Sequence, residues 1–159
     1  MAVWQFSVVF LPESWAQENN YDSASLYDEE GYDTECAWQE SQPDALFKTI
    51  LSKILPESKS WNQDLLFWGN TQEHDIQVWY ENSKVEGVHV RLDVNQSIND
   101  ILVKVVRAAN ELDCVLFFPE FRQIAKANEF ELKTALKKSN AAKYVSDPQG
   151  FLNEISNKT

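Results

Sequence analysis

Residues 74–93, HDIQVWYENSKVEGVHVRLD, decide the fold. Apolar and polar side chains alternate in both halves of this segment, and residues 82–84 separate the halves, which is the pattern of a β-hairpin that buries one face. A three-residue turn would pair Glu81 with Val85, Trp79 with Gly87, Gln77 with His89 and Asp75 with Arg91. A slip of one residue would turn the apolar side chains outward, so the alternation also predicts the register.

The segments on either side of the hairpin predict further strands and helices. Short apolar runs that end at a proline or glycine predict strands at 3–11, 65–68 and 113–118. Apolar residues at three-and-four spacing, with capping residues in front of them, predict a helix that starts at 41–44 and ends before Pro56, a helix at 97–112, and two more that begin near Asn128 and Asp147. The helix at 97–112 predicts a right-handed crossover between parallel neighbouring strands.

This order of elements favours the α+β class, because the strands come in groups and do not alternate strictly with helices. We expect a single domain over residues 1–159. It should contain a four- or five-stranded sheet, mixed or mostly antiparallel, with helices packed on one face. A ferredoxin-like arrangement with additions is one candidate topology. A chain of this length buries roughly 70% of its unfolded surface, enough for a self-sufficient core.

The charge of the chain is concentrated near its beginning. The net charge is −11, and the first 50 residues hold ten carboxylates but only one basic residue, Lys48. Residues 122–143 show the opposite bias, with six basic and two acidic residues. Such an acidic balance argues against nucleic-acid binding, which needs clustered Lys and Arg. It favours cations or a basic protein surface as partners.

The acidic stretch at 12–40 has no sustained periodicity, and we expect a long loop with at most one short helical turn. Aromatic rings are threaded through it. Our first hypothesis is a docking surface, in which rings provide contact area and carboxylates pair with Lys or Arg of a partner. The candidate binding residues are Tyr27, Asp28, Glu29, Glu30, Tyr32, Asp33, Glu35 and Trp38. The alternative is a solvated loop whose rings pack back onto the domain.

In size and composition the chain resembles the toxin-neutralising immunity proteins of bacteria. The resemblance implies a non-enzymatic cytoplasmic protein that masks a basic partner, such as a nuclease-type toxin. The active site of a nuclease is basic because it holds phosphates, so carboxylates could occupy it.

Two other functions remain open. The polar face of the hairpin carries Trp79, His89, Arg91 and Asp93, which could form the site of an enzyme or small-ligand binder. That hypothesis requires a concave pocket and a shifted pKa for His89. The third hypothesis is a structural subunit of a larger assembly, with surplus aromatic residues at its interfaces.

Several kinds of chemistry have no support in the sequence. The chain has only four glycines and lacks the motifs of a P-loop, a dinucleotide site or a serine hydrolase. Cys36 lies among carboxylates that disfavour a thiolate, and no paired Cys/His spacing predicts a metal site. We therefore expect no cofactor and no metal. No apolar run reaches the roughly 20 residues of a membrane span, and the N-terminal sequence lacks the pattern of a signal peptide.

Overall fold

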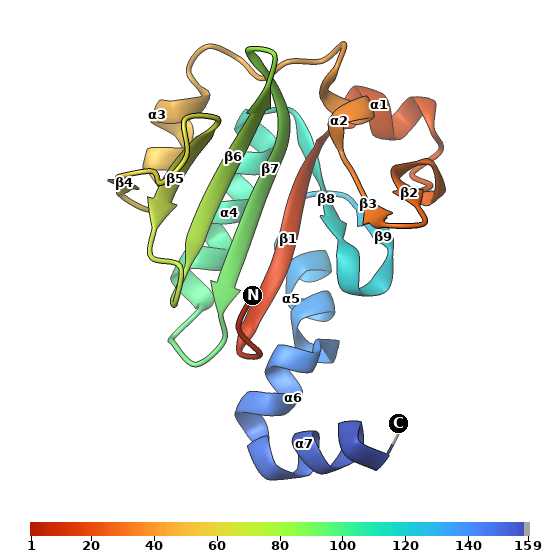
Figure 1. Ribbon diagram of the computed structural model, residues 1–159, viewed down its shortest axis with the longest axis vertical. Coiled ribbons are helices and arrows are strands. Elements are labelled where there is room, and N and C mark those ends of the chain that lie inside the picture. Colours follow the sequence, from red (N-terminus) through yellow and green to blue (C-terminus); the bar gives the residue numbers. More distant parts are fainter. Residues whose placement is uncertain (158–159) are drawn as a thin grey trace.

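A computed structural model describes residues 1–157 and shows an α+β fold built on a large sheet (Figure 1). The sheet has seven strands in the order β4-β5-β6-β7-β1-β8-β9, and all neighbouring strands run antiparallel. The predicted class is confirmed, although the sheet is larger than the four or five strands expected. The strands are β1 (Gln5–Pro12), β4 (Glu57–Ser58), β5 (Leu65–Gly69), β6 (Asp75–Glu81), β7 (Lys84–Asp93), β8 (Cys114–Phe118) and β9 (Gln123–Ala125).

The centre of the sheet has the ferredoxin-like arrangement. Strands β6, β7, β1 and β8 are neighbours in that order, and α3 (Phe47–Ser52) and α4 (Asn99–Glu111) lie in the two crossover connections. Strands β4 and β5 extend one edge, and β9 extends the other. The crossover through α4 joins β7 to β8, which run in the same direction, but β1 lies between them. The prediction that these two strands are neighbours was therefore wrong, because β1 inserts between them.

The hairpin has the predicted register at its centre and a tighter turn at its end. Asp75 pairs with Arg91, Gln77 with His89 and Trp79 with Gly87, as the alternation indicated. Glu81, however, pairs with Lys84 across the two-residue turn Asn82-Ser83, and an irregularity after Trp79 absorbs the difference. Both turn residues have positive φ, 50° and 66°, which is the geometry of the hairpin turns that match strand twist.

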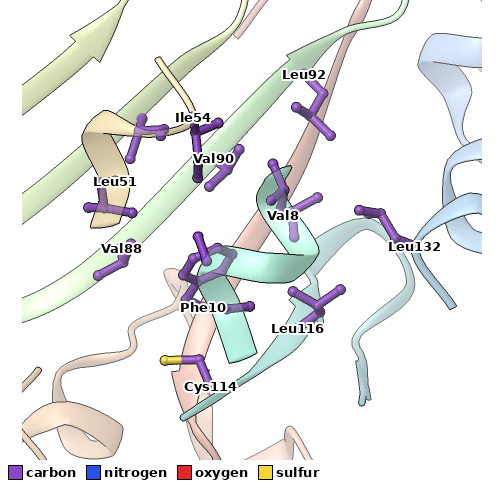
Figure 2. Close-up of a cluster of buried hydrophobic side chains, with 14 of the residues drawn as sticks. Val8, Phe10, Leu51, Ile54, Val88, Val90, Leu92, Cys114, Leu116 and Leu132 are labelled. Atoms are coloured by element: carbon purple, nitrogen blue, oxygen red, sulfur yellow. The ribbon is translucent and has the colours of Figure 1, made fainter. Parts of the chain in front are cut away.

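The main core lies between one face of the sheet and helices α3, α4 and α5 (Glu129–Lys138). Alternate residues of β1 and β7 point into it, and Figure 2 shows Val8, Phe10, Val88 and Val90 facing the side chains of neighbouring elements. Burial of these apolar side chains provides the driving force for this layer, because their transfer out of water contributes roughly 25 cal/mol for each Å². In Figure 1, α4 lies behind the central strands, where it covers this face.

Residues 12–40 cover part of the opposite face of the sheet, and they contain more regular structure than the long loop with one short helical turn that we expected. They form α1 (Glu13–Glu18), the short 3-10 helix η1 (Ala24–Leu26), the two-stranded ribbon β2 (Tyr27–Asp28) and β3 (Gly31–Tyr32), and α2 (Glu35–Trp38). A second apolar cluster holds this layer against β1 and β8, through residues such as Val9, Ala16, Ala37 and Phe117. The prediction of helices on a single face therefore does not extend to α1 and α2.

Two fully buried tryptophans give a matched test of polar burial. The Trp68 indole Nε1 donates to Ser52 Oγ at 3.0 Å, whereas Trp38 Nε1 is buried without a hydrogen-bond partner among the described residues. Replacing Trp38 with Phe removes an unsatisfied buried donor, whereas replacing Trp68 with Phe breaks the hydrogen bond to the exposed Ser52. We expect Trp68→Phe to lower the free energy of unfolding by about 1–3 kcal/mol more than Trp38→Phe, as measured by urea denaturation. Equal losses would contradict this account.

The C-terminal part continues with η2 (Pro119–Phe121), α6 (Asn140–Ser146) and α7 (Pro148–Asn157). Within residues 1–157, the helices are too short or too polar to cross a bilayer.

Candidate functional site

A cleft of about 760 Å³ opens on the part of the sheet that residues 12–40 leave uncovered. Its floor is formed by side chains of β1, β6 and β7, including Gln77, Trp79 and Arg91. The β2–β3 ribbon forms one wall through Tyr27 and Tyr32. The two regions that the sequence suggested as alternative sites, the acidic segment and the hairpin face, therefore meet in one concave site. We call this hollow the aromatic cleft.

His89 lines this cleft, and its neighbour on the same strand face, Gly87, leaves room for its ring. A Cβ placed on Gly87 would come within 2.6 Å of His89 Nε2, so only glycine leaves room for the imidazole in this position. The Tyr32 ring packs near it, with ring centroids 6.2 Å apart. Burial, and then the positive charge of Arg91, lower the pKa of His89 to about 4. The imidazole is therefore neutral at physiological pH, and one of its nitrogens is a free acceptor.

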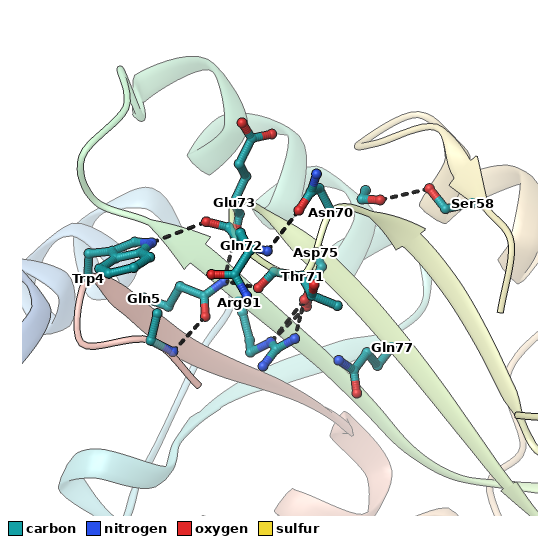
Figure 3. Close-up of polar contacts among 12 residues, drawn as sticks. Trp4, Gln5, Ser58, Asn70, Thr71, Gln72, Glu73, Asp75, Gln77 and Arg91 are labelled. Carbon is teal, nitrogen blue, oxygen red and sulfur yellow. Dashed lines mark hydrogen bonds and ion pairs between the residues drawn. The ribbon is translucent and has the colours of Figure 1, made fainter. Parts of the chain in front are cut away.

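Arg91 is held in place by a buried carboxylate, and Figure 3 shows the two side chains pointing toward each other. Its Nε lies 2.9 Å from Asp75 Oδ1, and its Nη2 forms an ion pair with Asp75 Oδ2. Asp75 is completely buried. The sequence predicted this cross-strand pair but placed it on an open polar surface.

Asp93 does not join the predicted ligand site; its side chain stabilises the loop that follows β7. It is 5% exposed, and it accepts hydrogen bonds from Asn95 N at 2.9 Å and Gln96 Nε2 at 3.0 Å. These bonds order the loop between β7 and α4. Asp93 is not part of the lining of the aromatic cleft, whereas Trp79, His89 and Arg91 are.

No pattern in the sequence indicated that the segment after β8 contributes to this site. The Arg122 guanidinium lies over the Tyr27 ring, 4.2 Å from its centroid. Glu120 accepts from Asn140 N at 3.1 Å, and burial raises the pKa of its carboxyl. Both side chains line the aromatic cleft. Arg122 has a left-handed backbone, φ 51°, at the sharp turn between η2 and β9, and this turn aims its side chain at the ribbon.

A second hollow of about 430 Å³ adjoins the first and shares Gly31, Tyr32, Trp79 and His89 with it. Its other walls are largely acidic, so we call it the acidic pocket. The carboxylates that line it are Asp28, Glu30, Asp33 and Glu86. Two of them are oriented by the backbone: Asp28 Oδ1 accepts from Glu30 N at 2.8 Å, and Asp33 Oδ1 accepts from Glu35 N at 2.9 Å.

Glu86 also belongs to a group of three carboxylates that crowd together where α2 meets the hairpin turn. Oxygens of Glu35, Glu81 and Glu86 lie within 4.8 Å of one another. Partial burial, a hydrogen bond shared with Glu81 and the nearby negative charges raise the pKa of Glu86 to about 7. The charge of Glu81 also raises the pKa of Glu35. The ion pairs formed within residues 1–157 include none of these three carboxylates. Their oxygens are of the type that Ca²⁺ and Mg²⁺ bind, but exposed carboxylates also group without an ion.

The predicted partner-binding residues fall into two groups. Asp28, Glu29, Glu30 and Asp33 are exposed, and Glu35 is partly exposed. Tyr27 and Tyr32 are half-buried, and their rings pack edge to face on Phe117. Trp38 is 1% exposed and lies in the core, which removes it from the set of surface anchors. The rings of this segment therefore serve mainly to attach it to the sheet, as the alternative interpretation had it, while the carboxylates remain outside.

The cysteines have the properties that the sequence indicated. Both are free. Burial and the charge of Asp33 raise the pKa of the Cys36 thiol, so its nucleophilic thiolate is disfavoured.

Because these carboxylates are crowded, we expect the free energy of unfolding to fall as pH rises. The folded protein holds the Glu86 proton up to a pKa of about 7, above its ordinary value of 4.5, so ionisation of this group opposes folding. Glu86→Gln should leave stability unchanged at about pH 4 and raise the free energy of unfolding by about 1 kcal/mol at about pH 8, after allowing for solvent screening. Urea denaturation at both pH values measures this. Glu57→Gln, at an exposed carboxylate on β4, is the matched control and should change neither value.

Comparisons with known proteins found no matching family model, no similar curated protein and no similar solved structure.

Proposed function

We propose that this protein binds a positively charged partner protein through the acidic surface formed by residues 28–35 and the turn between β6 and β7. Two sequence segments contribute to this surface. Asp28, Glu30, Asp33 and Glu35 come from the ribbon and α2, and Glu81 and Glu86 come from the hairpin.

The observation that carries the proposal is the close approach of Glu35, Glu81 and Glu86, with no Lys or Arg side chain of residues 1–157 paired to any of them. Ionisation of these groups works against the fold: burial and then the neighbouring carboxylates raise the pKa of Glu86, and the charge of Glu81 raises that of Glu35. A Lys or Arg side chain from a partner would relieve the repulsion among these carboxylates on binding. The free energy that opposes folding would then favour association, and the effect would be strongest at low salt.

The ordered structure of residues 27–35 supports the same function. The carboxylates of Asp28 and Asp33 are held by backbone hydrogen bonds, and Thr34 Oγ1 donates to Glu86 O at 2.7 Å, which ties the segment to β7. A surface that is already ordered loses little conformational entropy when a partner binds.

The partner class that fits this surface is a basic nuclease-type toxin, whose phosphate-binding site carboxylates would mask. The function is then that of an immunity or inhibitor protein, and it requires no catalysis by this chain. We place it in the cytoplasm, where two unpaired cysteines remain reduced.

The direct test uses a peptide of alternating lysine and glycine residues, with a peptide of alternating glutamate and glycine as its control. Isothermal titration should show binding of the lysine peptide that weakens steadily as salt concentration rises, because screening shortens the range of the attraction. Binding that is independent of salt, or equal binding of both peptides, would refute the proposal.

A small-ligand function is the second candidate, and the aromatic cleft is the observation that favours it. The cleft has the size of ligand pockets, which span about 300–1,000 Å³, and combines rings with a neutral imidazole and two arginines. Ligand-observed NMR with aromatic carboxylates tests this function. Signals that broaden with the wild type but not with Gly87→Ala, which displaces His89, would support it, and identical spectra for both proteins would exclude it.

A further inference from the structure

We infer that the acidic pocket is a site for an arginine side chain of the partner and that it prefers arginine to lysine. This inference rests on the proposed function and specifies which residue of a basic partner enters the site. It is carried by the combination of ring faces, carboxylates and an unpaired imidazole in one hollow.

The ring walls come from both sides of the hollow. Tyr32 belongs to the ribbon and Trp79 to β6, and both line the acidic pocket. The Trp79 indole Nε1 donates to Gln77 Oε1 at 3.1 Å, which fixes the orientation of the ring. A guanidinium is planar and weakly hydrated, so it stacks on aromatic faces more readily than an ammonium group does.

The carboxylates of the pocket are not neutralised by a paired Lys or Arg among the described residues. Asp28, Glu30, Asp33 and Glu86 line it, and the ion pairs of the described chain involve none of them. An arginine side chain offers five N–H donors in a rigid plane, which can satisfy several carboxylates from different directions at once. Lysine offers three donors at a single point.

His89 is an independent observation that points to a ligand. Its imidazole is partly buried at the junction of the two hollows, and no hydrogen bond or ion pair of the described residues engages its nitrogens. Gly87 makes room for it in this position. Burial keeps the ring neutral, so it can accept a hydrogen bond from a cationic donor without repelling it.

A divalent cation fits this pocket less well than a guanidinium. Among the described residues, the group with metal-ligand spacing is Glu35, Glu81 and Glu86; it shares Glu86 with the pocket but includes none of Asp28, Glu30 and Asp33. The pocket volume of about 430 Å³ also exceeds what a bare ion needs and accommodates a side chain with its aliphatic stem.

The experiment compares N-acetyl-arginine amide with N-acetyl-lysine amide, which carry the same charge, by NMR titration of the labelled protein. We expect the arginine probe to bind at least about tenfold more tightly, a difference of about 1.4 kcal/mol. It should also shift the indole signal of Trp79. Equal affinities, or shifts confined to other parts of the protein, would overturn the inference.

Two pairs of variants locate the site. Trp79→Leu should reduce the preference for arginine to less than about twofold, whereas Trp61→Leu, at a ring that is 57% exposed and lines neither hollow, should preserve it. Asp33→Asn keeps the backbone hydrogen bond but removes the charge, so it should weaken the arginine probe without a change in packing; Asp64→Asn should not. Unchanged affinity in Asp33→Asn, or displacement of arginine by calcium chloride or magnesium chloride alone at equal concentration, would overturn the inference. If the lysine–glycine peptide still binds with salt dependence while arginine shows no preference, this inference fails and the proposed function stands.

Discussion

Arg91→Met should lower the free energy of unfolding by about 3–5 kcal/mol, the range expected when one partner of a buried ion pair is removed. Asp75 has no solvent exposure, and the Arg91 side chain is only 19% exposed. Loss of the guanidinium would leave a carboxylate buried on the sheet face with no counter-charge (Figure 3). Because small domains have a total stability of only about 5–15 kcal/mol, this variant should be close to its folding limit.

The double variant Asp75→Asn with Arg91→Met is the control for this prediction. The double variant removes the Asp75 carboxylate as well as the Arg91 guanidinium, so no unpaired charge stays buried. It should therefore recover at least about half of the stability that Arg91→Met loses. Urea denaturation of the wild type, the Arg91→Met variant and the double variant completes the test. A loss of less than about 1 kcal/mol for Arg91→Met would mean that the pair behaves as an exposed surface pair. The interpretation of Asp75 as a buried carboxylate that needs the Arg91 counter-charge would then be wrong.

The second large effect concerns binding. The triple variant Asp33→Asn, Glu81→Gln and Glu86→Gln should weaken the lysine–glycine peptide by about 10–100-fold at low salt, because each close charge pair contributes about 1 kcal/mol or less when exposed and more when partly buried. The same variant should be as stable as the wild type or more so, since it removes mutual repulsion around Glu86. Loss of binding together with retained stability is the signature of a surface built for a partner.

A second triple variant tests whether peptide binding depends on where the carboxylates lie or only on the net charge of the protein. Glu57→Gln, Asp64→Asn and Glu131→Gln change the net charge by the same amount, but these residues lie on β4, on the loop before β5 and on α5. We expect this variant to bind the peptide with nearly wild-type affinity. If both triple variants lose affinity equally, the protein attracts cations through its overall charge of −11 and has no specific acidic surface.

The hairpin could be predicted from the sequence because its information is local. Alternation along residues 75–93 determines which side chains face the core, and a register slip would expose all of these core side chains. Asp75, Gln77 and Trp79 therefore have the expected partners on β7. The turn differs because Asn82 and Ser83 both adopt positive φ, a tolerance that the alternation does not encode. The two-residue strand β4 and the three-residue strand β9 are too short to have a recognisable period.

The candidate site was only partly predictable because its two halves are far apart in the sequence. Composition identified the carboxylates at 28–35, and alternation identified Trp79, His89 and Arg91, but no local pattern indicates that the ribbon packs beside the hairpin. Glu86 was missed because its role depends on α2, which brings Glu35 close to it. Trp38 was misassigned because composition does not distinguish a ring that holds a segment down from a ring that meets a partner.

The most direct test of the central claim is to map the surface that a cationic partner contacts. Backbone amide signals of the labelled protein are followed by NMR during titration with the lysine–glycine peptide. The structure predicts that the largest shifts fall on residues 28–35, on the hairpin turn at 81–86 and on Trp79, and that α4 and α5 are unaffected. Shifts spread evenly over the molecule, or centred on other elements, would contradict the assignment of this surface as the binding site.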